Sequence, residues 1–109
     1  MNEDIYSPNQ SYKITLSSYE IKMSHWVAQP YLIRLSDDVT LFSLKGDPWS
    51  AFTVKWLDDV TVEMELARYP GRTSARLILQ PAIDQATATT YTSSFSGTLS
   101  EVSRWILDL

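Results

Sequence analysis

The sequence contains no cysteine and only one histidine. Without cysteine the chain can form no disulfide, no thiolate metal site and no thiol nucleophile. This absence fits a reducing compartment, and a metal site would have to be assembled mainly from carboxylates. We therefore expect no bound metal and no cofactor.

Long apolar runs and an excess of positive charge are also missing. No stretch of about 18 apolar residues is present to span a bilayer, and the first ten residues are acidic, unlike a signal peptide. We therefore expect a cytoplasmic protein without a membrane partner. The net charge of −4 opposes contact with a phosphate backbone, so nucleic acid is not an expected partner, whereas a basic protein is compatible.

The composition is that of an ordinary globular protein. The 109 residues include 44% hydrophobic and 20% charged residues, enough apolar material for a packed core without disulfides. We expect one domain spanning residues 1–109.

Alternation of apolar and polar residues, the pattern of a β-strand, dominates the chain. Tyr12, Ile14 and Leu16 fill alternate positions, and the phase changes after Ser17-Ser18. Because Ser-Ser lacks the glycine or asparagine favoured in tight hairpin turns, we expect a bulge there within one long bent strand.

The tetrapeptide Asp-Asp-Val-Thr occurs twice, at residues 37–40 and 58–61. Adjacent carboxylates suggest a metal site, but neighbouring strand residues point to opposite faces and converge poorly on one ion. Calcium also needs about six to eight oxygen ligands. Aspartate is favoured in turns because its carboxylate bonds nearby backbone amides, so both copies are predicted to be hairpin turns.

Each turn implies a register. A two-residue loop at Asp37-Asp38 places Ile33 and Phe42 on the same core face. A three-residue loop over 57–59 pairs Trp56 with Val60 and directs Phe52 inward, opposite Met64. The following strand ends at Tyr69-Pro70-Gly71-Arg72, which has the pattern of a type II turn.

The C-terminal third changes character. A strand over 75–80 is expected to pair with the strand before the Pro-Gly turn, and residues 82–96 are compatible with an edge strand or a loop. Thr98 and Glu101 have the spacing of a capping box at the start of a helix. The expected fold is mainly β, an antiparallel β meander forming a curled sheet or small sandwich with one C-terminal α-helix.

Three residues are the first candidates for chemistry or binding. His25 could act as a general base, but the sequence favours the simpler interpretation of a hydrogen-bonded strand histidine. Trp26 falls on a polar strand face and Trp49 in a turn-forming stretch, so either could contact a partner. Alternatively, Trp49 plugs one end of the core and Trp26 packs under the C-terminal helix.

Glu63 and Glu65 form a second candidate surface. They alternate with apolar residues on one strand, and together with the two Asp-Asp pairs they could form an acidic recognition surface. A plain solvated strand face is the alternative interpretation.

A homodimer is a further prediction. In the predicted register, the second face of the hairpin 31–44 carries Leu32, Val39 and Leu41, which is more apolar than a solvated face requires. Either the sheet curls over and buries these residues, or they meet a second copy together with Trp26.

One stretch resembles a known family. Residues 6–14, YSPNQSYKI, look like the Ser-Pro-Asp-Gly opening of many β-propeller blades, with Asn9-Gln10 in place of Asp-Gly. Taken whole, the chain is similar to small bacterial β-rich proteins that carry no assigned activity. The resemblance implies a turn leading into a strand, blade-like hairpins and a meander topology, and it implies no ligand.

Three classes of function remain compatible with the sequence. The first is a non-catalytic protein that recognises another macromolecule, and the second is an acidic immunity or inhibitor protein that blocks a basic toxin. The third is a small ligand-binding protein or enzyme that uses His25 and exposed tryptophans. The absence of a catalytic constellation favours the first two.

Overall fold

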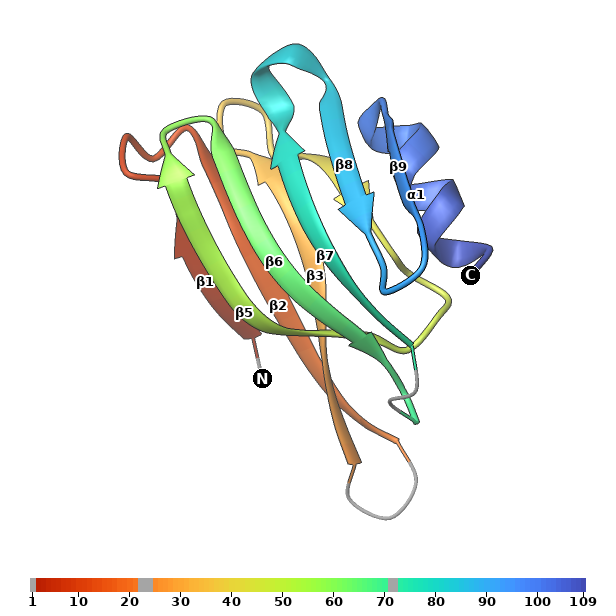
Figure 1. Cartoon of the computed structure of the whole chain (residues 1–109). Coiled ribbons are helices and arrows are strands. Elements are labelled where there is room, and N and C mark those ends of the chain that lie inside the picture. Colours follow the sequence, from red (N-terminus) through yellow and green to blue (C-terminus); the bar gives the residue numbers. More distant parts are fainter. Residues whose placement is uncertain (1, 22–24, 71–72) are drawn as a thin grey trace.

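The computed structural model describes residues 2–21, 25–70 and 73–109, which form two antiparallel sheets and a C-terminal helix (Figure 1). The first sheet has the order β1 (Asn2–Tyr6), β2 (Tyr12–Ile21), β3 (His25–Arg34), β4 (Val39–Ser43). The second has the order β5 (Trp49–Asp58), β6 (Thr61–Arg68), β7 (Thr73–Gln80), β8 (Gln85–Thr89), β9 (Ser94–Gly97). A short 3-10 helix, η2 (Pro81–Ile83), precedes β8, and α1 (Leu99–Leu107) follows β9. The predicted mainly β meander with a C-terminal helix is confirmed.

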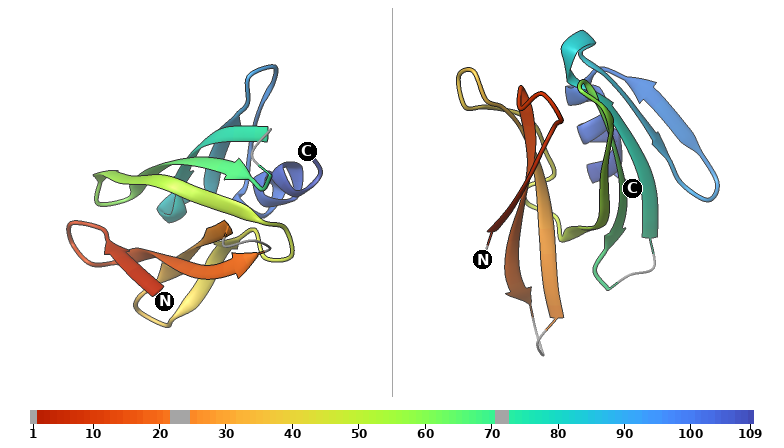
Figure 2. Two further views of the ribbon diagram at one scale, coloured as in Figure 1. Left: turned by 90° about the horizontal axis from the view of Figure 1, so that it is seen from below. Right: turned by 90° about the vertical axis from the view of Figure 1, so that its left-hand side faces the viewer.

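The two sheets face each other as the layers of a sandwich (Figure 2). Alternate residues of both sheets point inward and share one core, in which these side chains are fully buried: Ile14, Leu32, Leu44, Trp49, Val62, Met64, Leu66, Leu77 and Leu79. Burial of such a side chain contributes about 1.5–3 kcal/mol relative to exposure. The core therefore joins the two sheets into one packed unit.

Helix α1 packs against β4, β8 and β9 and buries Leu99, Val102 and Ile106. Its predicted capping box is present, because Thr98 Oγ1 accepts from the Glu101 amide and the Glu101 carboxylate accepts from the Thr98 amide. These bonds to Thr98 lower the pKa of Glu101. The cap fixes the start of the helix beside the core.

Strand β2 is continuous, as predicted, but the predicted bulge at Ser17-Ser18 is wrong. Its register with β3 runs without a shift from Tyr12 opposite Arg34 to Ile21 opposite His25. The β2–β3 hairpin extends beyond the second sheet at the lower end of the molecule (Figures 1 and 2). The apolar pattern changes phase where the opposite face of the hairpin becomes the covered one, since Val27, opposite Tyr19, is buried.

The predicted register of the β3–β4 hairpin is also wrong. A four-residue loop, 35–38, replaces the expected two-residue turn, and the register shifts by one residue after Leu32. Leu32 therefore lies opposite Phe42, and both side chains are buried in the core. The register that turns Leu32 inward is favoured because the second sheet covers this face of β3 and buries the side chain.

This register removes the surface on which the homodimer prediction rested. Leu32 is fully buried, Leu41 packs partly against the core, and Val39 remains exposed. The three side chains form no shared exposed patch. The sandwich covers the apolar face within one chain, which was the alternative that the sequence left open.

The β5–β6 turn lies at Asp59-Val60 instead of residues 57–59, and the pairing of the two strands is shifted by two residues from the prediction. Trp56 pairs with Val62 instead of Val60, and a shift of two residues keeps the same faces inward. Phe52 was predicted to point into the core, but the register shifts between Ala51 and Thr53. Phe52 is consequently 60% exposed.

Both Asp-Asp copies serve as turns, as predicted. Asp58 Oδ1 accepts from the Val60 amide at 2.8 Å, and Asp37 Oδ1 accepts from the Val39 amide at 3.4 Å. The Arg34 guanidinium bonds both oxygens of Asp37 and lowers the pKa of that carboxyl. The adjacent Asp38 takes a positive φ of 57°, a conformation that aspartate tolerates better than most residues.

The predicted type II turn falls partly on Gly71 and Arg72, which lie outside the described residues. The strand pairing on either side of it is confirmed, with Arg68 opposite Thr73. The stretch 82–96, which the sequence left open, contains the end of η2 and most of the β8–β9 hairpin. Within the described ranges, no helix is long and apolar enough to cross a membrane.

Candidate functional site

A cleft lies at the lower end of the sandwich, where the β2–β3 hairpin projects past the second sheet. Its volume is about 190 Å³, and it is lined by His25, Trp26, Val27, Ser50, Ala67, Arg68, Tyr69 and Pro70. We call this region the hairpin cleft. It brings together two of the residues selected from the sequence, His25 and Trp26.

The start of β5 closes one side of the hairpin cleft. Strand β4 pairs only with the second half of β3, from Tyr31 to Arg34, and leaves the first half free on that edge. The start of β5 lies beside that free half, and the Ala28 amide donates to Ser50 Oγ at 3.0 Å. The cleft is therefore built on two anchored strands.

Trp26 is the most exposed tryptophan in the described structure, with 63% of its surface accessible. It lies opposite Glu20, on the strand face that farther along β3 carries buried Leu32. The β2–β3 hairpin, which begins β3 with His25 and Trp26, projects past the second sheet at this end (Figure 1). The alternative that Trp26 packs under the C-terminal helix is wrong.

His25 contacts an aromatic ring across the hairpin cleft. Its imidazole centroid lies 5.0 Å from that of Tyr69, with the ring planes tilted by 58°, a favourable geometry for two aromatic rings. Ser24, its neighbour in the sequence, lies outside the described residues. Tyr69, which the sequence reasoning treated only as part of a turn, is thus a constituent of the site.

Trp49 lies next to Ser50 but belongs to the core. Its side chain is 0% exposed, and the Arg68 guanidinium carbon lies 5.6 Å from its ring centroid. Arg68 in turn donates to the Leu109 carbonyl at 2.7 Å. Trp49 plugs the core, as one alternative proposed, and a direct contact role for it is not supported by this position.

The Trp49 indole buries its N–H group in the core. Its Nε1 is buried and has no hydrogen-bond acceptor among the described residues. A buried donor without an acceptor costs about 1–3 kcal/mol. Packing of the Trp49 ring against the core and Arg68, and not a hydrogen bond, therefore holds this side chain in place.

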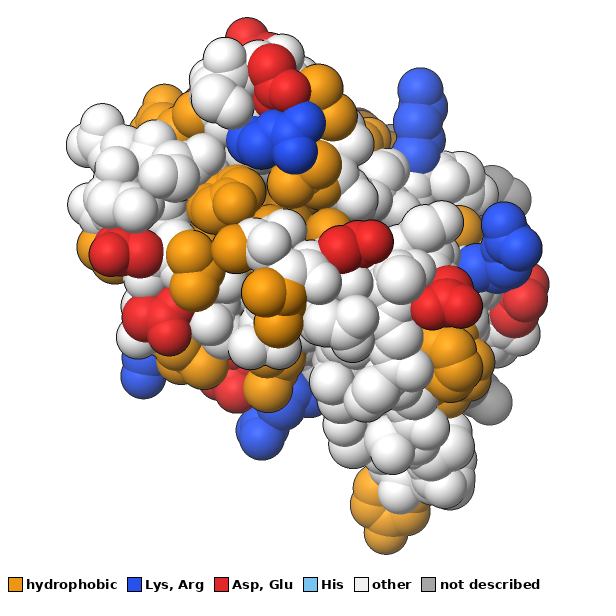
Figure 3. All heavy atoms as spheres, turned by 90° about the horizontal axis from the view of Figure 1, so that it is seen from above, with side chains coloured by type: hydrophobic (Ala, Val, Ile, Leu, Met, Phe, Trp, Pro, Cys, Tyr) orange, Lys and Arg blue, Asp and Glu red, His pale blue; other side chains and the backbone are white. Residues whose placement is uncertain are grey.

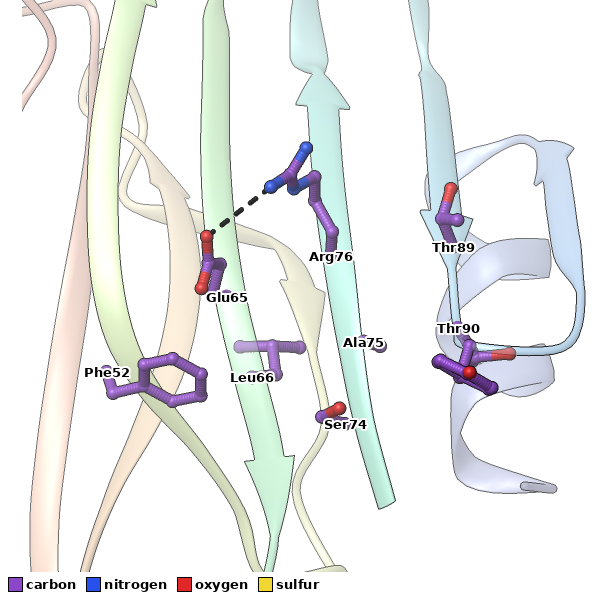
Figure 4. Close-up of a pocket in the computed structure, with 9 residues that line it drawn as sticks. Phe52, Glu65, Leu66, Ser74, Ala75, Arg76, Thr89 and Thr90 are labelled. Atoms are coloured by element: carbon purple, nitrogen blue, oxygen red, sulfur yellow. Dashed lines mark ion pairs between the residues drawn. The ribbon is translucent and has the colours of Figure 1, made fainter.

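Glu63 and Glu65 lie half-buried on the outer face of the second sheet. Glu63 lies opposite Lys55 on β5, and Glu65 Oε1 is 3.6 Å from Arg76 Nη2 on β7 (Figure 4). Each acidic residue therefore has a basic neighbour. This face is charge-balanced and does not form the acidic surface that one interpretation of the sequence required.

A shallow hollow of about 220 Å³ crosses the same outer face. Glu65 and Arg76 point toward each other over it, Phe52 borders it on β5, and Thr89 and Thr90 border it on the other side (Figure 4). Tyr91, in the β8–β9 turn, is fully exposed at its rim. Sequence reasoning missed Phe52, because only the register shift in β5 turns it outward.

The upper end of the sandwich, seen in Figure 3, mixes acidic, basic and hydrophobic side chains. Both Asp-Asp turns lie at this end, together with exposed Leu57, Val60 and Ile83. In the described ranges, no three His, Cys, Asp or Glu residues are arranged to hold a metal ion. The Asp-Asp pairs are placed for turns rather than around a common point.

The Ser-Pro segment that resembles a propeller-blade opening forms a turn into β2. The Ser7 carbonyl accepts from the Gln10 amide at 2.8 Å, and Ser7 Oγ accepts from the Tyr12 amide at 3.1 Å. Comparisons of the chain with protein-family models, with curated proteins and with solved structures found no match.

Proposed function

We propose that this chain is a non-catalytic interaction protein that recognises another protein through the hairpin cleft. The observation that carries the proposal is Trp26, 63% exposed beside the His25–Tyr69 ring pair. Tryptophan is enriched among the interface residues that dominate binding energies. Trp26 is proposed as the main contact residue.

The size and shape of the hairpin cleft favour a protein segment over a small molecule. Its volume of about 190 Å³ is below the roughly 300–1,000 Å³ of most small-molecule sites. A protruding loop of a partner protein can fill the hairpin cleft and cover Trp26 as well. Protein recognition is therefore favoured over the ligand-binding or enzyme alternative.

Two polar side chains that line the hairpin cleft with His25, Ser50 and Arg68, are engaged in structural bonds. Ser50 Oγ accepts from the Ala28 amide, and Arg68 donates to the Leu109 carbonyl. A catalytic histidine needs a nucleophile or an orienting acceptor within reach. The arrangement supports a contact role for His25 through its ring.

The chemistry of the surface suggests the partner. Trp26, His25 and Tyr69 present aromatic faces, which accept apolar groups and also cationic side chains. The net charge of −4 increases the rate of encounter with a basic protein, particularly at low salt. A basic toxin blocked by this chain is one such partner and remains the more specific version of the proposal.

The experiment is affinity capture from cells that make the protein, with three baits: wild type, Trp26→Ala and Tyr91→Ala. Tyr91 is the matched control because it is an exposed aromatic residue in the β8–β9 turn, outside the hairpin cleft. A partner is expected to bind wild type and Tyr91→Ala, and to bind Trp26→Ala at least tenfold more weakly when purified and titrated. A partner that binds all three baits equally contradicts the proposed site.

A further inference from the structure

Strand β9 ends the second sheet, and no strand in the described ranges pairs with its outer edge. Residues 85–100 contain no charged residue and no proline. Proteins commonly protect exposed edge strands with charges or proline, because an unprotected edge pairs with other strands. Edge β9 lacks both of these protections.

The outer strands of the first sheet, β1 and β4, carry charges or side-chain hydrogen bonds to their backbone. Strand β1 carries Glu3 and Asp4, and Trp56 Nε1 donates to its Ile5 carbonyl at 3.0 Å. On β4, the Ser43 carbonyl accepts from Ser103 Oγ of helix α1 at 2.7 Å. Strand β5, the other outer strand of the second sheet, carries Lys55 and Asp58 and accepts the Ala28 amide through Ser50 Oγ. Compared with these three edges, β9 is the one available for pairing.

The hydrogen-bond phase of the hairpin shows which backbone groups of β9 are free. The Thr90 amide donates to the Ser93 carbonyl at 2.7 Å, and Phe95 lies opposite Ala88. Because bonded pairs alternate in an antiparallel ladder, Phe95 bonds inward to β8, and the N–H and C=O groups of Ser94 and Ser96 point outward. Both serines are exposed.

We propose that a second copy of this chain pairs antiparallel with β9 about a two-fold axis centred on Phe95. In this register Ser94 lies opposite the partner's Ser96, and the outward N–H and C=O groups of each serine meet their counterparts. The two five-stranded sheets then continue as one sheet. The pairing is self-complementary because the pattern Ser-Phe-Ser is symmetric about its centre.

Charge favours a second copy as the occupant. Two copies of net charge −4 repel each other, and that repulsion is least where both surfaces are uncharged. Beside the edge, Phe95 stacks on Trp105 with ring centroids 5.7 Å apart. The adjoining hollow on α1 carries both signs of charge, with Arg104 between Glu101 and Asp108, so a two-fold partner can place unlike charges near each other.

The proposal is tested by light scattering coupled to size exclusion and by sedimentation, from low to high micromolar concentration. Wild type is expected to reach the mass of two chains. Ser96→Pro removes an outward N–H but no ladder bond within the chain, and is expected to weaken association about tenfold or more. Ser96→Ala is the control, because it removes the hydroxyl that bonds Thr87 and keeps the backbone donor.

Amide hydrogen exchange of the wild type tests the same pairing without a variant, and so is independent of whether Ser96→Pro folds. In wild type, the Ser94 and Ser96 amides are expected to exchange more slowly as the concentration rises, while the exchange of other exposed amides stays unchanged. A single-chain mass at high micromolar concentration contradicts the proposal. A dimer in which these two amides exchange at the same rate at every concentration also contradicts it, because its interface lies elsewhere.

Discussion

At the upper end of the sandwich, polar side chains are used to close turns, whereas at the lower end aromatic side chains are left uncovered. Asp37 and Asp58 each bond the amide two residues ahead, and Asp37 is further held by Arg34. At the lower end, Trp26 and His25 are exposed on a hairpin that has passed the edge of the opposing sheet. The conspicuous acidic motif is structural, and the less conspicuous aromatic residues are the ones free to bind.

The two neighbouring tryptophans show the same contrast at close range. Trp49 and Trp26 both lie at the lower end, but Trp49 is 0% and Trp26 is 63% exposed. Trp49 stabilises the core through its fully buried ring, whereas most of the Trp26 surface contacts no other part of the described structure. Residue type alone therefore does not identify a binding residue, and the position relative to the second sheet does.

The largest expected effect comes from truncating these two tryptophans separately. Trp49→Ala is expected to lower the free energy of unfolding by about 3–5 kcal/mol, because it leaves a cavity in the core. Trp26→Ala is expected to change it by less than about 0.5 kcal/mol. Urea unfolding followed by circular dichroism measures both, and equal losses would contradict the distinction between a core and a contact tryptophan.

A smaller effect is expected from the turn aspartates of the upper end. Asp58→Ala removes the acceptor of the Val60 amide and is expected to cost about 1 kcal/mol. Asp58→Asn keeps a side-chain oxygen in place and is the matched control, with a smaller expected loss. Thermal unfolding of both variants checks the prediction, and the turn role is wrong if Asp58→Ala is as stable as wild type.

The smallest effect is a pH dependence at the same end. The hydrogen bond from Arg34 lowers the pKa of Asp37 below its usual value near 3.8. A carboxyl whose pKa is lower in the folded state stabilises the fold above its usual pKa, and this contribution is lost as the pH falls through the lower, folded-state pKa. The β3–β4 turn is therefore expected to loosen in acid below about pH 4.

Amide NMR measures this loosening at Val39, next to the turn. An Asp37→Asn variant carries no titrating group at this position, so its Val39 signal is expected to show a weaker change over the same pH range. An identical pH response in both proteins would show that another carboxyl controls the turn.

The fold class could be predicted from the sequence because its signals are local. Alternation of apolar residues, the Asp turns and the capping box at Thr98 and Glu101 each depend on residues within a few positions of one another. These predictions were confirmed. The β8–β9 hairpin was not predicted because its alternating Ala, Thr and Ser residues give little contrast between the two faces.

The errors arise where the register or the overlap of the two sheets decides the outcome. The four-residue β3–β4 loop turns Leu32 toward the same core as Phe42, whereas the predicted tight turn placed the two side chains on opposite faces. The register shift in β5 exposes Phe52, which alternation had placed inside. The contact between the His25 and Tyr69 rings depends on how the β2–β3 hairpin is placed against the second sheet. No pattern of neighbouring residues predicts that placement.

The most direct test of the account is photo-crosslinking from the two ends of the sandwich. A photoreactive phenylalanine analogue replaces Trp26 at the lower end or Val60, also exposed, at the upper end, in cells that make the protein naturally. The account predicts a crosslinked partner protein from position 26 and none from position 60. A partner crosslinked from position 60 and not from position 26 would contradict it, because the upper end would then be the binding surface.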